Sequence, residues 1–421
     1  VFTDAFTGHI QDVQLQPRYA SGQLQIGFIA VMEALENRAQ IKYGGNYTPK
    51  TIAAIDLDYL SQGAGAGRRL EMASADPAPA SGGMTLPVNT AYPAGASPEE
   101  AWRTMIQSWQ ERIKDPFLGI YTPVTRLAYR DFTNRPDSSL EKQYTTYASK
   151  RHTVRQDGDY AVIYFGRKKG WDNAPFLFCR TDEGWQFDIV HQRRFIRMGR
   201  APDWGVEFAE HPHMKLLMDA FHFNGQDIPA PDGDRYTIRD DERLAQRILW
   251  YEGRLKRTPD DPATLLELGR LYTITAMGTK AIPLLKRFLK KSPNAPAAVK
   301  YLAIAHVDAY YQYDHARDLL AEYIEHAPED PFGHVFSGYI HYCQKSYPAA
   351  RRAFERALAI DADDGYAHFY LTYTYAWLHA GASSLNPAKD GYRQRFRMHR
   401  EKTRALAHPL RVARLNRWLD K

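Results

Sequence analysis

The sequence predicts a multidomain protein of the α+β plus all-α class, in which a middle α+β domain precedes a C-terminal α-solenoid. Prolines recur at Pro259, Pro293 and Pro328, in steps of 34 and 35 residues, and Ala362 follows 34 residues later. A fixed step of this size indicates one helical unit copied several times. Upstream, residues 143–195 are rich in β-forming segments, which indicates a sheet. The repeats favour a protein that holds another molecule over one that transforms it.

Residues 1–62 predict a helical first segment. Apolar side chains recur there at helical spacing, at Ile26, Ile29, Met32 and Leu35, before a Gly-Gly pair stops the helix. This order of helix, Gly-Gly-Asn-Tyr-Thr-Pro turn and short apolar run resembles the region after the long helix of type IV pilins and pseudopilins. The first twenty residues are polar, unlike the apolar start of those proteins. The resemblance implies a component of an extracellular or pilus-like assembly.

Residues 63–97 predict a linker, because they are rich in Ala, Pro, Gly and Ser and show no periodicity. Such a stretch is either extended or wrapped over a neighbour. Its Gly-Ala-Gly-Ala-Gly run is not expected to bind phosphate, since the spacing differs from GxGxxG and no Lys-Ser/Thr pair follows.

Residues 98–205 predict an α+β domain that begins with a helix. Ser97 is the expected N-cap, Pro98 occupies the first helical position, and two glutamates follow in the first turn. Strands are expected over 143–156 and 159–168.

A hairpin is expected over residues 174–195, with its turn at Asp182-Glu183-Gly184. Its sequence PFLFCRTDEGWQFDIV resembles the last strands of the NTF2-like (SnoaL-type) superfamily. The resemblance covers about 98–205 and implies a curved sheet wrapped around a pocket.

Five side chains of this domain could line such a pocket: Tyr160, Tyr164, Trp185, Asp188 and His191. In NTF2-like enzymes an Asp or His in the cavity performs acid–base chemistry. Here only strand position supports that role, and no motif does. This leaves a small-molecule-binding or enzymatic NTF2-like domain as the alternative function.

The connector, residues 206–241, holds the densest group of candidate metal ligands: Glu210, His211, His213 and His222. A metal site needs three or four convergent ligands. The proline between the first two histidines is expected to point them in poorly matched directions, and no HExxH motif is present. We therefore expect no metal site and no cofactor.

Residues 242–380 predict the solenoid itself. In the unit 331–364, small residues at Gly338 and Ala350 let two helices approach, and Phe354 fills the seam between them. This pattern resembles the tetratricopeptide repeat (TPR) family, whose unit has 34 residues. The resemblance implies three full repeats of paired antiparallel helices, with a flanking helix on either side.

The TPR resemblance also implies a concave face lined by the first helix of each repeat. Candidate partner-binding residues on that face are Arg270, His306, Tyr339, Tyr342, Phe369 and Tyr373. Aromatic side chains and arginine are the types enriched where proteins bind peptides. The competing interpretation is that some of them pack against the chain's own C-terminal helices or against the 63–97 linker.

Residues 381–421 predict basic helices that cap the solenoid. Within 388–421, eleven Lys and Arg residues face three acidic ones, a net charge of +8 against +6 for the whole chain. This tail could meet an acidic partner; nucleic acid is disfavoured as a partner but stays open.

Composition excludes several classes. The chain has 421 residues, 44% of them hydrophobic and 25% charged, as in a globular protein, and no apolar run is long enough to cross a bilayer. Cys179 and Cys343 form no metal-binding spacing and are expected to be buried thiols. No GxSxG, Walker or CxxCH motif is present.

The sequence therefore predicts a non-enzymatic interaction or assembly scaffold without a cofactor. Its expected partner is a protein or peptide, or another copy of the chain. We favour the bacterial periplasm or cell envelope over the cytoplasm as its location.

Overall fold

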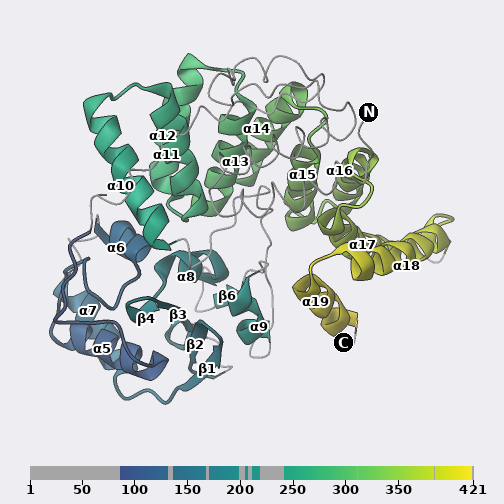
Figure 1. Cartoon of the computed structure of the whole chain (residues 1–421). Helices are drawn as coiled ribbons and strands as arrows, with labels where there is room; N and C mark the ends of the chain where they lie inside the picture. Colours follow the sequence, from purple (N-terminus) through teal and green to yellow (C-terminus); the bar gives the residue numbers. More distant parts are fainter. Residues whose placement is uncertain are drawn as a thin grey trace, which may run out of the picture. The chain divides into compact units, whose positions relative to one another are not determined.

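The computed structural model describes residues 86–421, except for 131–135, 167–169, 199–203, 207–210, 219–240, 311, 384 and 420–421. The chain divides into two compact units, Val1–Ser74 and Ala75–Lys421. The first unit lies outside the described residues, and with it the helix predicted in 1–62. The second unit contains the middle domain and the helical repeats (Figure 1).

The middle domain is built on a four-stranded antiparallel sheet with the strand order β1-β2-β3-β4. The strands are β1 (Thr153–Asp157), β2 (Tyr160–Tyr164), β3 (Phe176–Thr181) and β4 (Gly184–Phe187). The predicted hairpin turn is confirmed, because Thr181 pairs with Gly184 across a two-residue loop.

Side chains alternate across this sheet and create two cores. One face carries Ile163 and Phe178, which pack with Trp102 and Met105 of α5 (Pro98–Gln110). The opposite face carries Val162 and Leu177, which pack with Met214 and Leu217 of α9 (Pro212–Met218). The sheet is therefore covered on both sides, and α9 brings the two connector histidines against it.

The start of α5 confirms the predicted cap. Ser97 is extended, and its Oγ accepts a hydrogen bond from the Glu100 backbone N–H at 3.2 Å. The Glu100 carboxylate in turn accepts from the backbone N–H of Ala96 at 2.9 Å. This arrangement differs from a capping box by one residue, because the glutamate reaches the residue before the N-cap.

The described part of the linker, residues 86–97, wraps over the middle domain. Gly95 exchanges two backbone hydrogen bonds with Trp185 of β4, at 2.8 and 2.9 Å. A Cβ at Gly95 would lie 2.3 Å from the backbone nitrogen of Ala101, so only glycine fits this close approach.

Two strand predictions are wrong. Residues 143–147 belong to helix α7 (Asp137–Tyr147), because Leu140 and Tyr147 are buried at a helical seven-residue separation. The second predicted strand of the hairpin ends at Phe187, since the Asp188 carboxylate caps a new helix, α8 (Ile189–Phe195). A short two-stranded sheet of β5 (Ile196–Met198) and β6 (Trp204–Val206) follows.

The C-terminal part is a TPR-like array of helical hairpins, as the sequence predicts. The prediction of three repeats with a flanking helix on either side differs at the end, where the helix Gly365–Gly381 pairs with Lys389–Leu406 and forms a fourth hairpin. After α10 (Asp241–Arg257), the hairpins follow in chain order, and each packs on the next (Figure 1). Their helices are α11 (Pro262–Ile274) and α12 (Gly278–Lys291), α13 (Pro296–Tyr310) and α14 (Tyr313–His326), α15 (Pro331–Cys343) and α16 (Tyr347–Ile360), and α17 (Gly365–Gly381) and α18 (Lys389–Leu406).

Small residues close the hairpins as the repeat pattern predicts. A Cβ at Gly269 would lie 2.6 Å from the Leu285 side chain, and one at Gly338 would lie 2.8 Å from the Phe354 ring. Glycine at these positions lets the paired helices approach until the apolar partner fills the seam. Leu285 and Phe354 are fully buried there.

The middle domain and the first hairpins share one hydrophobic core. Leu127 and Ala128 of α6 (Pro123–Tyr129) pack in the same cluster as Leu244 and Ile248 of α10. Near them, the buried Asp241 carboxylate accepts the backbone N–H of Val124 at 2.8 Å. The middle domain and the first hairpins therefore pack directly against each other.

The last helix, α19 (Pro409–Leu419), contacts both regions. Leu415 is fully buried in the cluster of the later hairpins, while Leu410 and Ala413 pack against the core beneath α9. Among the described residues, no helix is both long and apolar enough to span a membrane.

Candidate functional site

The six predicted partner-binding residues differ in their exposure. Tyr339 and Phe369 are fully buried, and His306 and Tyr373 are nearly so. Arg270 and Tyr342 keep partial exposure. The sequence places all six on the concave face of the hairpin array by repeat register alone. Their role in binding stays a prediction.

Arg270 and His306 are held by polar neighbours. The Arg270 guanidinium forms two hydrogen bonds with the Glu267 carboxylate, at 2.7 and 2.9 Å. His306 Nδ1 lies 2.6 Å from the side-chain oxygen of Gln312. Burial lowers the pKa of His306, so this ring is neutral near pH 7.

Helix α19 covers the aromatic residues of α17, as the competing interpretation of the sequence proposed. We call Tyr366, Phe369 and Tyr373 the α19 seat. The Trp418 ring meets Tyr373 edge to face at a centroid distance of 4.8 Å. The Arg411 guanidinium lies 4.4 Å from the centre of the Tyr366 ring and 5.4 Å from that of Phe369.

The second group of candidate residues is a buried histidine cluster, which we define as His191, His211 and His213. It begins with Asp188, which follows β4 directly and is fully buried. The Asp188 Oδ1 atom accepts the backbone N–H groups of Val190 and His191, each at 3.0 Å. Its Oδ2 atom is hydrogen-bonded to His191 Nδ1. Capping of α8 thus orients the His191 ring, with Nδ1 engaged by the Asp188 carboxylate.

His213 enters the cluster from the first turn of α9. Its Nε2 atom lies 2.9 Å from the Phe178 carbonyl oxygen of β3, which can only accept, so Nε2 carries the ring proton. The opposite atom, Nδ1, is then a lone-pair acceptor. It is buried and has no hydrogen-bond partner.

His211 lies between the other two rings. Its Nδ1 atom accepts the backbone N–H of His213 at 3.3 Å, a long hydrogen bond. Its Nε2 atom is buried without a hydrogen-bond partner. Ring centroids are 4.0 Å apart for His191 and His211, and 5.1 Å apart for His211 and His213.

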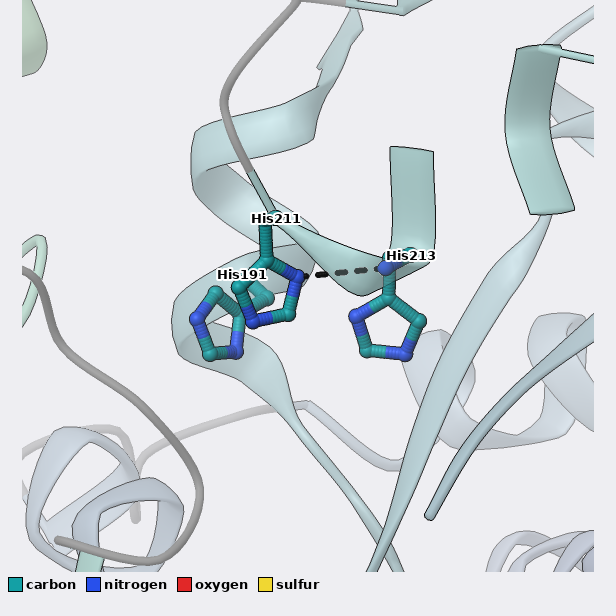
Figure 2. Close-up of side chains that lie close together, drawn as sticks. All are labelled: His191, His211 and His213. Carbon is teal, nitrogen blue, oxygen red and sulfur yellow. Dashed lines mark hydrogen bonds between the residues drawn. The ribbon is translucent and has the colours of Figure 1, made fainter. Parts of the chain in front are cut away.

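The three rings converge from α8 and from the start of α9, which are twenty residues apart along the chain. Figure 2 shows the rings next to one another, with His211 between the other two. One nitrogen from each ring lies within 4.8 Å of those from the other two, an arrangement that could hold a metal ion. The expectation that Pro212 points His211 and His213 apart is therefore wrong. Two other residues of the predicted group, Glu210 and His222, lie outside the described residues.

Burial disfavours protonation of two of the three rings, His211 and His213. Burial lowers the pKa of His213 to about 4. Burial, together with the nearby His191, lowers the pKa of His211 well below its ordinary value. Burial alone would raise the pKa of Asp188, but attraction to His191 and the hydrogen bonds between them outweigh it and lower that pKa. His211 and His213 are therefore neutral near pH 7, which is the form in which an imidazole ligates a metal.

Cys179 lies close by but does not belong to the ligand group. Its Sγ atom is 3.8 Å from Asp188 Oδ2. Burial raises the pKa of this thiol well above its ordinary value, so it stays protonated. Cys179 is buried as predicted, whereas Cys343 is only partly buried, and neither forms a disulfide.

A separate cavity lies on the other face of the sheet. It has a volume of about 140 Å³, and its lining includes Trp109, Tyr121, Phe187 and Gln143. The five residues predicted to line a pocket do not line this cavity. Trp185 packs in the core on that same face, whereas Tyr160 lies against His211 and His213 at centroid distances of 5.1 Å.

No family model and no curated protein matches this chain. Solved structures similar to it include the MamA protein, with 21% identity over 38% of this chain and 82% of that one, at a TM-score of 0.34. MamA 41-end from Desulfovibrio magneticus RS-1 has 16% identity over 39% and 88%, also at 0.34. TTC0263, a thermophilic TPR protein in Thermus thermophilus, has 19% identity over 42% and 91%, at 0.33. The fold assignment rests on the chain's own hairpins.

Proposed function

We propose that this protein is a protein-interaction scaffold whose partner presents an amphipathic helix or peptide to the inner face of the hairpin array. The observation that carries the proposal is α19 itself. It lies as a helix on Phe369 and Tyr373, two positions that the repeat register assigns to the concave face. A surface that accepts one amphipathic helix has the shape and chemistry to accept another.

The chemistry of the α19 seat defines the partner. The seat offers aromatic faces, and α19 meets them with the guanidinium groups of Arg411 and Arg414 and the Trp418 ring. A competing helix therefore needs arginine and an aromatic residue within one or two turns. Partner binding at the seat requires α19 to leave, so α19 limits the apparent affinity of the full chain.

A peptide experiment tests this directly. A fluorescent peptide of residues 409–421 is added to the full chain and to a chain that ends at His408. We expect the anisotropy to rise with the shortened chain and to stay low with the full chain, because the full chain's seat is already covered. Replacing Phe369 by Leu in the shortened chain should weaken peptide binding about fivefold, through loss of an aromatic contact.

The matched control is Phe396→Leu, an aromatic residue of α18 that is outside the seat. Circular dichroism checks that each chain is folded. Equal binding of the peptide to the full and shortened chains would refute competition at the seat. Partners captured from a lysate by the shortened chain, and displaced by unlabelled peptide, then identify the natural ligand.

A second candidate function, a small-molecule-binding or enzymatic NTF2-like domain, is favoured by the cavity of about 140 Å³ under the sheet. Apolar cavities of this size hold a single aromatic ring. Ligand-detected NMR with benzene and phenol tests this candidate, and Met105→Trp, which fills the cavity from α5, should abolish binding. Binding that persists in that variant would exclude the cavity.

A further inference from the structure

We propose that His191, His211 and His213 form a transition-metal site of the Zn²⁺ class in the middle domain. All three rings are at least nine-tenths buried, and one nitrogen of each lies within 4.8 Å of the others. Three histidine ligands with a remaining coordination position are a known arrangement for zinc. The proposal is independent of partner binding by the hairpin array.

The ligand set selects the metal. Imidazole nitrogens suit Zn²⁺, Co²⁺, Ni²⁺ and Cu²⁺, whereas Mg²⁺ and Ca²⁺ require oxygen ligands. On a tetrahedral zinc ion, ligand nitrogens are about 3.4 Å apart, given Zn–N distances of about 2.1 Å. The imidazoles therefore need to move inward by less than about 1 Å to reach coordination distance, which rotation about side-chain torsions supplies.

Two of the three rings are already oriented by outer partners. The Asp188 carboxylate is bonded to His191 Nδ1, and the Phe178 carbonyl accepts from His213 Nε2. A carboxylate or backbone carbonyl on the far nitrogen is the usual outer shell of a metal-bound histidine. With the outer partners on His191 Nδ1 and His213 Nε2, the proposal assigns coordination to the opposite nitrogen of each ring.

His211 has to change its hydrogen bonding on coordination. Because Nδ1 accepts the His213 backbone N–H at 3.3 Å, the neutral ring carries its proton on Nε2. Coordination through Nε2 moves that proton to Nδ1 and breaks this bond, at a cost of about 1 kcal/mol. Structural zinc binding contributes on the order of 10 kcal/mol. The loss is small against the gain, and coordination gives the buried Nε2 atom a partner that it lacks.

The fourth position would take water or a small anion. Three neutral imidazoles leave the charge of the ion uncompensated, and the Asp188 side chain bonded to His191 lies beside the cluster. A buried metal ion whose charge its ligands do not compensate favours an anion as its fourth ligand. The slight exposure of His211, at 6%, is the largest of the three rings and marks the side from which that ligand would enter.

Direct metal binding tests the proposal. The purified full chain is stripped with a chelator and titrated with Zn²⁺ against a competing dye, and with Co²⁺ followed by visible absorption. We expect about one metal ion per chain and the intense absorption of four-coordinate Co²⁺. The double variant His211→Gln/His213→Gln should take up none. Asp188→Asn should bind about 10- to 100-fold more weakly, because it loses the carboxylate that orients His191.

The matched control is His306→Gln in α13. It removes a buried histidine whose Nε2 also lacks a hydrogen-bond partner but which belongs to no convergent ligand group among the described residues. This variant should bind metal like the wild type. The proposal is overturned if the stripped wild type takes up neither metal, or if the double variant, folded by circular dichroism, binds as tightly as the wild type.

Discussion

Two groups of buried histidines in this molecule differ in whether their ring nitrogens have hydrogen-bond partners. In the last hairpin, His399 Nδ1 donates to His368 Nδ1 at 2.8 Å, and His368 Nε2 donates to the Ala362 carbonyl at 3.0 Å. In the middle domain, His211 Nε2 and His213 Nδ1 are buried without a hydrogen-bond partner.

The difference shows what separates a structural histidine from a candidate ligand. Burial is common to both groups, and each contains a ring whose pKa burial lowers: that of His399 falls to about 3 and that of His213 to about 4. Only the middle-domain cluster, among the described residues, brings three rings together and leaves nitrogens unsatisfied. In the last hairpin, His368 and His399 are hydrogen-bonded to each other and to the Ala362 carbonyl. Apolar packing then stabilises this hairpin.

The largest expected effect tests that packing. Phe354 is fully buried against Gly338 and stacks on Tyr370 at 5.7 Å. Phe354→Ala should lower the free energy of unfolding by about 3–5 kcal/mol, since it leaves a cavity in the seam. Urea unfolding followed by circular dichroism measures this. A loss below about 1 kcal/mol would show that the later hairpins do not depend on this seam.

The next effect separates the two histidine groups by metal. Zn²⁺ at one hundred times its dissociation constant should raise the free energy of unfolding by about 2.7 kcal/mol. The increase should disappear in His213→Gln and persist in His399→Gln, because the His368–His399 pair has no convergent third ligand among the described residues. Thermal unfolding with and without chelator measures this. Equal loss in both variants would contradict the comparison.

A pH effect follows from His399. Burial, and then the nearby His368 and Arg395, lowers its pKa from 6.5 to about 3 in the folded chain. Above about pH 6.5 both states are neutral and this stability is complete. As the pH falls from about 8 to about 5, the unfolded state takes up a proton that the folded state does not. His399 should then cost about 2 kcal/mol of unfolding free energy. The stripped wild type should lose more stability over this range than stripped His399→Gln; parallel curves would be evidence against this assignment.

The smallest expected effect comes from replacing glycine by alanine at two positions. Nothing lies within 4 Å of a Cβ at Gly391 in α18, whereas one at Gly338 would meet the Phe354 ring. Gly391→Ala should raise the free energy of unfolding by about 1 kcal/mol through helix propensity. Gly338→Ala should lower it, because the ring must move. The signs of the two changes in the urea midpoint are the test; the same sign for both would refute it.

The candidate site could be predicted only in halves. The sequence predicts Asp188 and His191 as pocket residues of the middle domain and, separately, groups His211 and His213 in the connector. Pro212 between the latter two predicts that their rings diverge. The missing information was that α9 packs on the face of the sheet opposite α5, which places His213 under the Phe178 carbonyl. Asp188 lies three residues before His191 and can cap a helix. That spacing was the sequence signal from which the orientation of the His191 ring could have been predicted.

On the concave face of the hairpin array, the sequence predicts which residues are neighbours but does not predict what covers them. Repeat register correctly identifies Phe369 and Tyr373 as neighbours on one side of α17, since they lie four residues apart on a helix. Register does not reveal that α19 covers them, because contacts of Trp418 and Arg411 depend on how the chain returns after α18.

The sequence by itself determined the periodic features of this protein: the helical hairpins, the cap at Ser97 and the β3–β4 turn. These depend on residues within about 35 positions of one another, where spacing alone specifies contact. Only the tertiary structure decided which helix lies on the α19 seat and which three histidines converge. Those contacts depend on how α9 folds back onto the sheet and how α19 returns after α18, and no periodic spacing encodes either path.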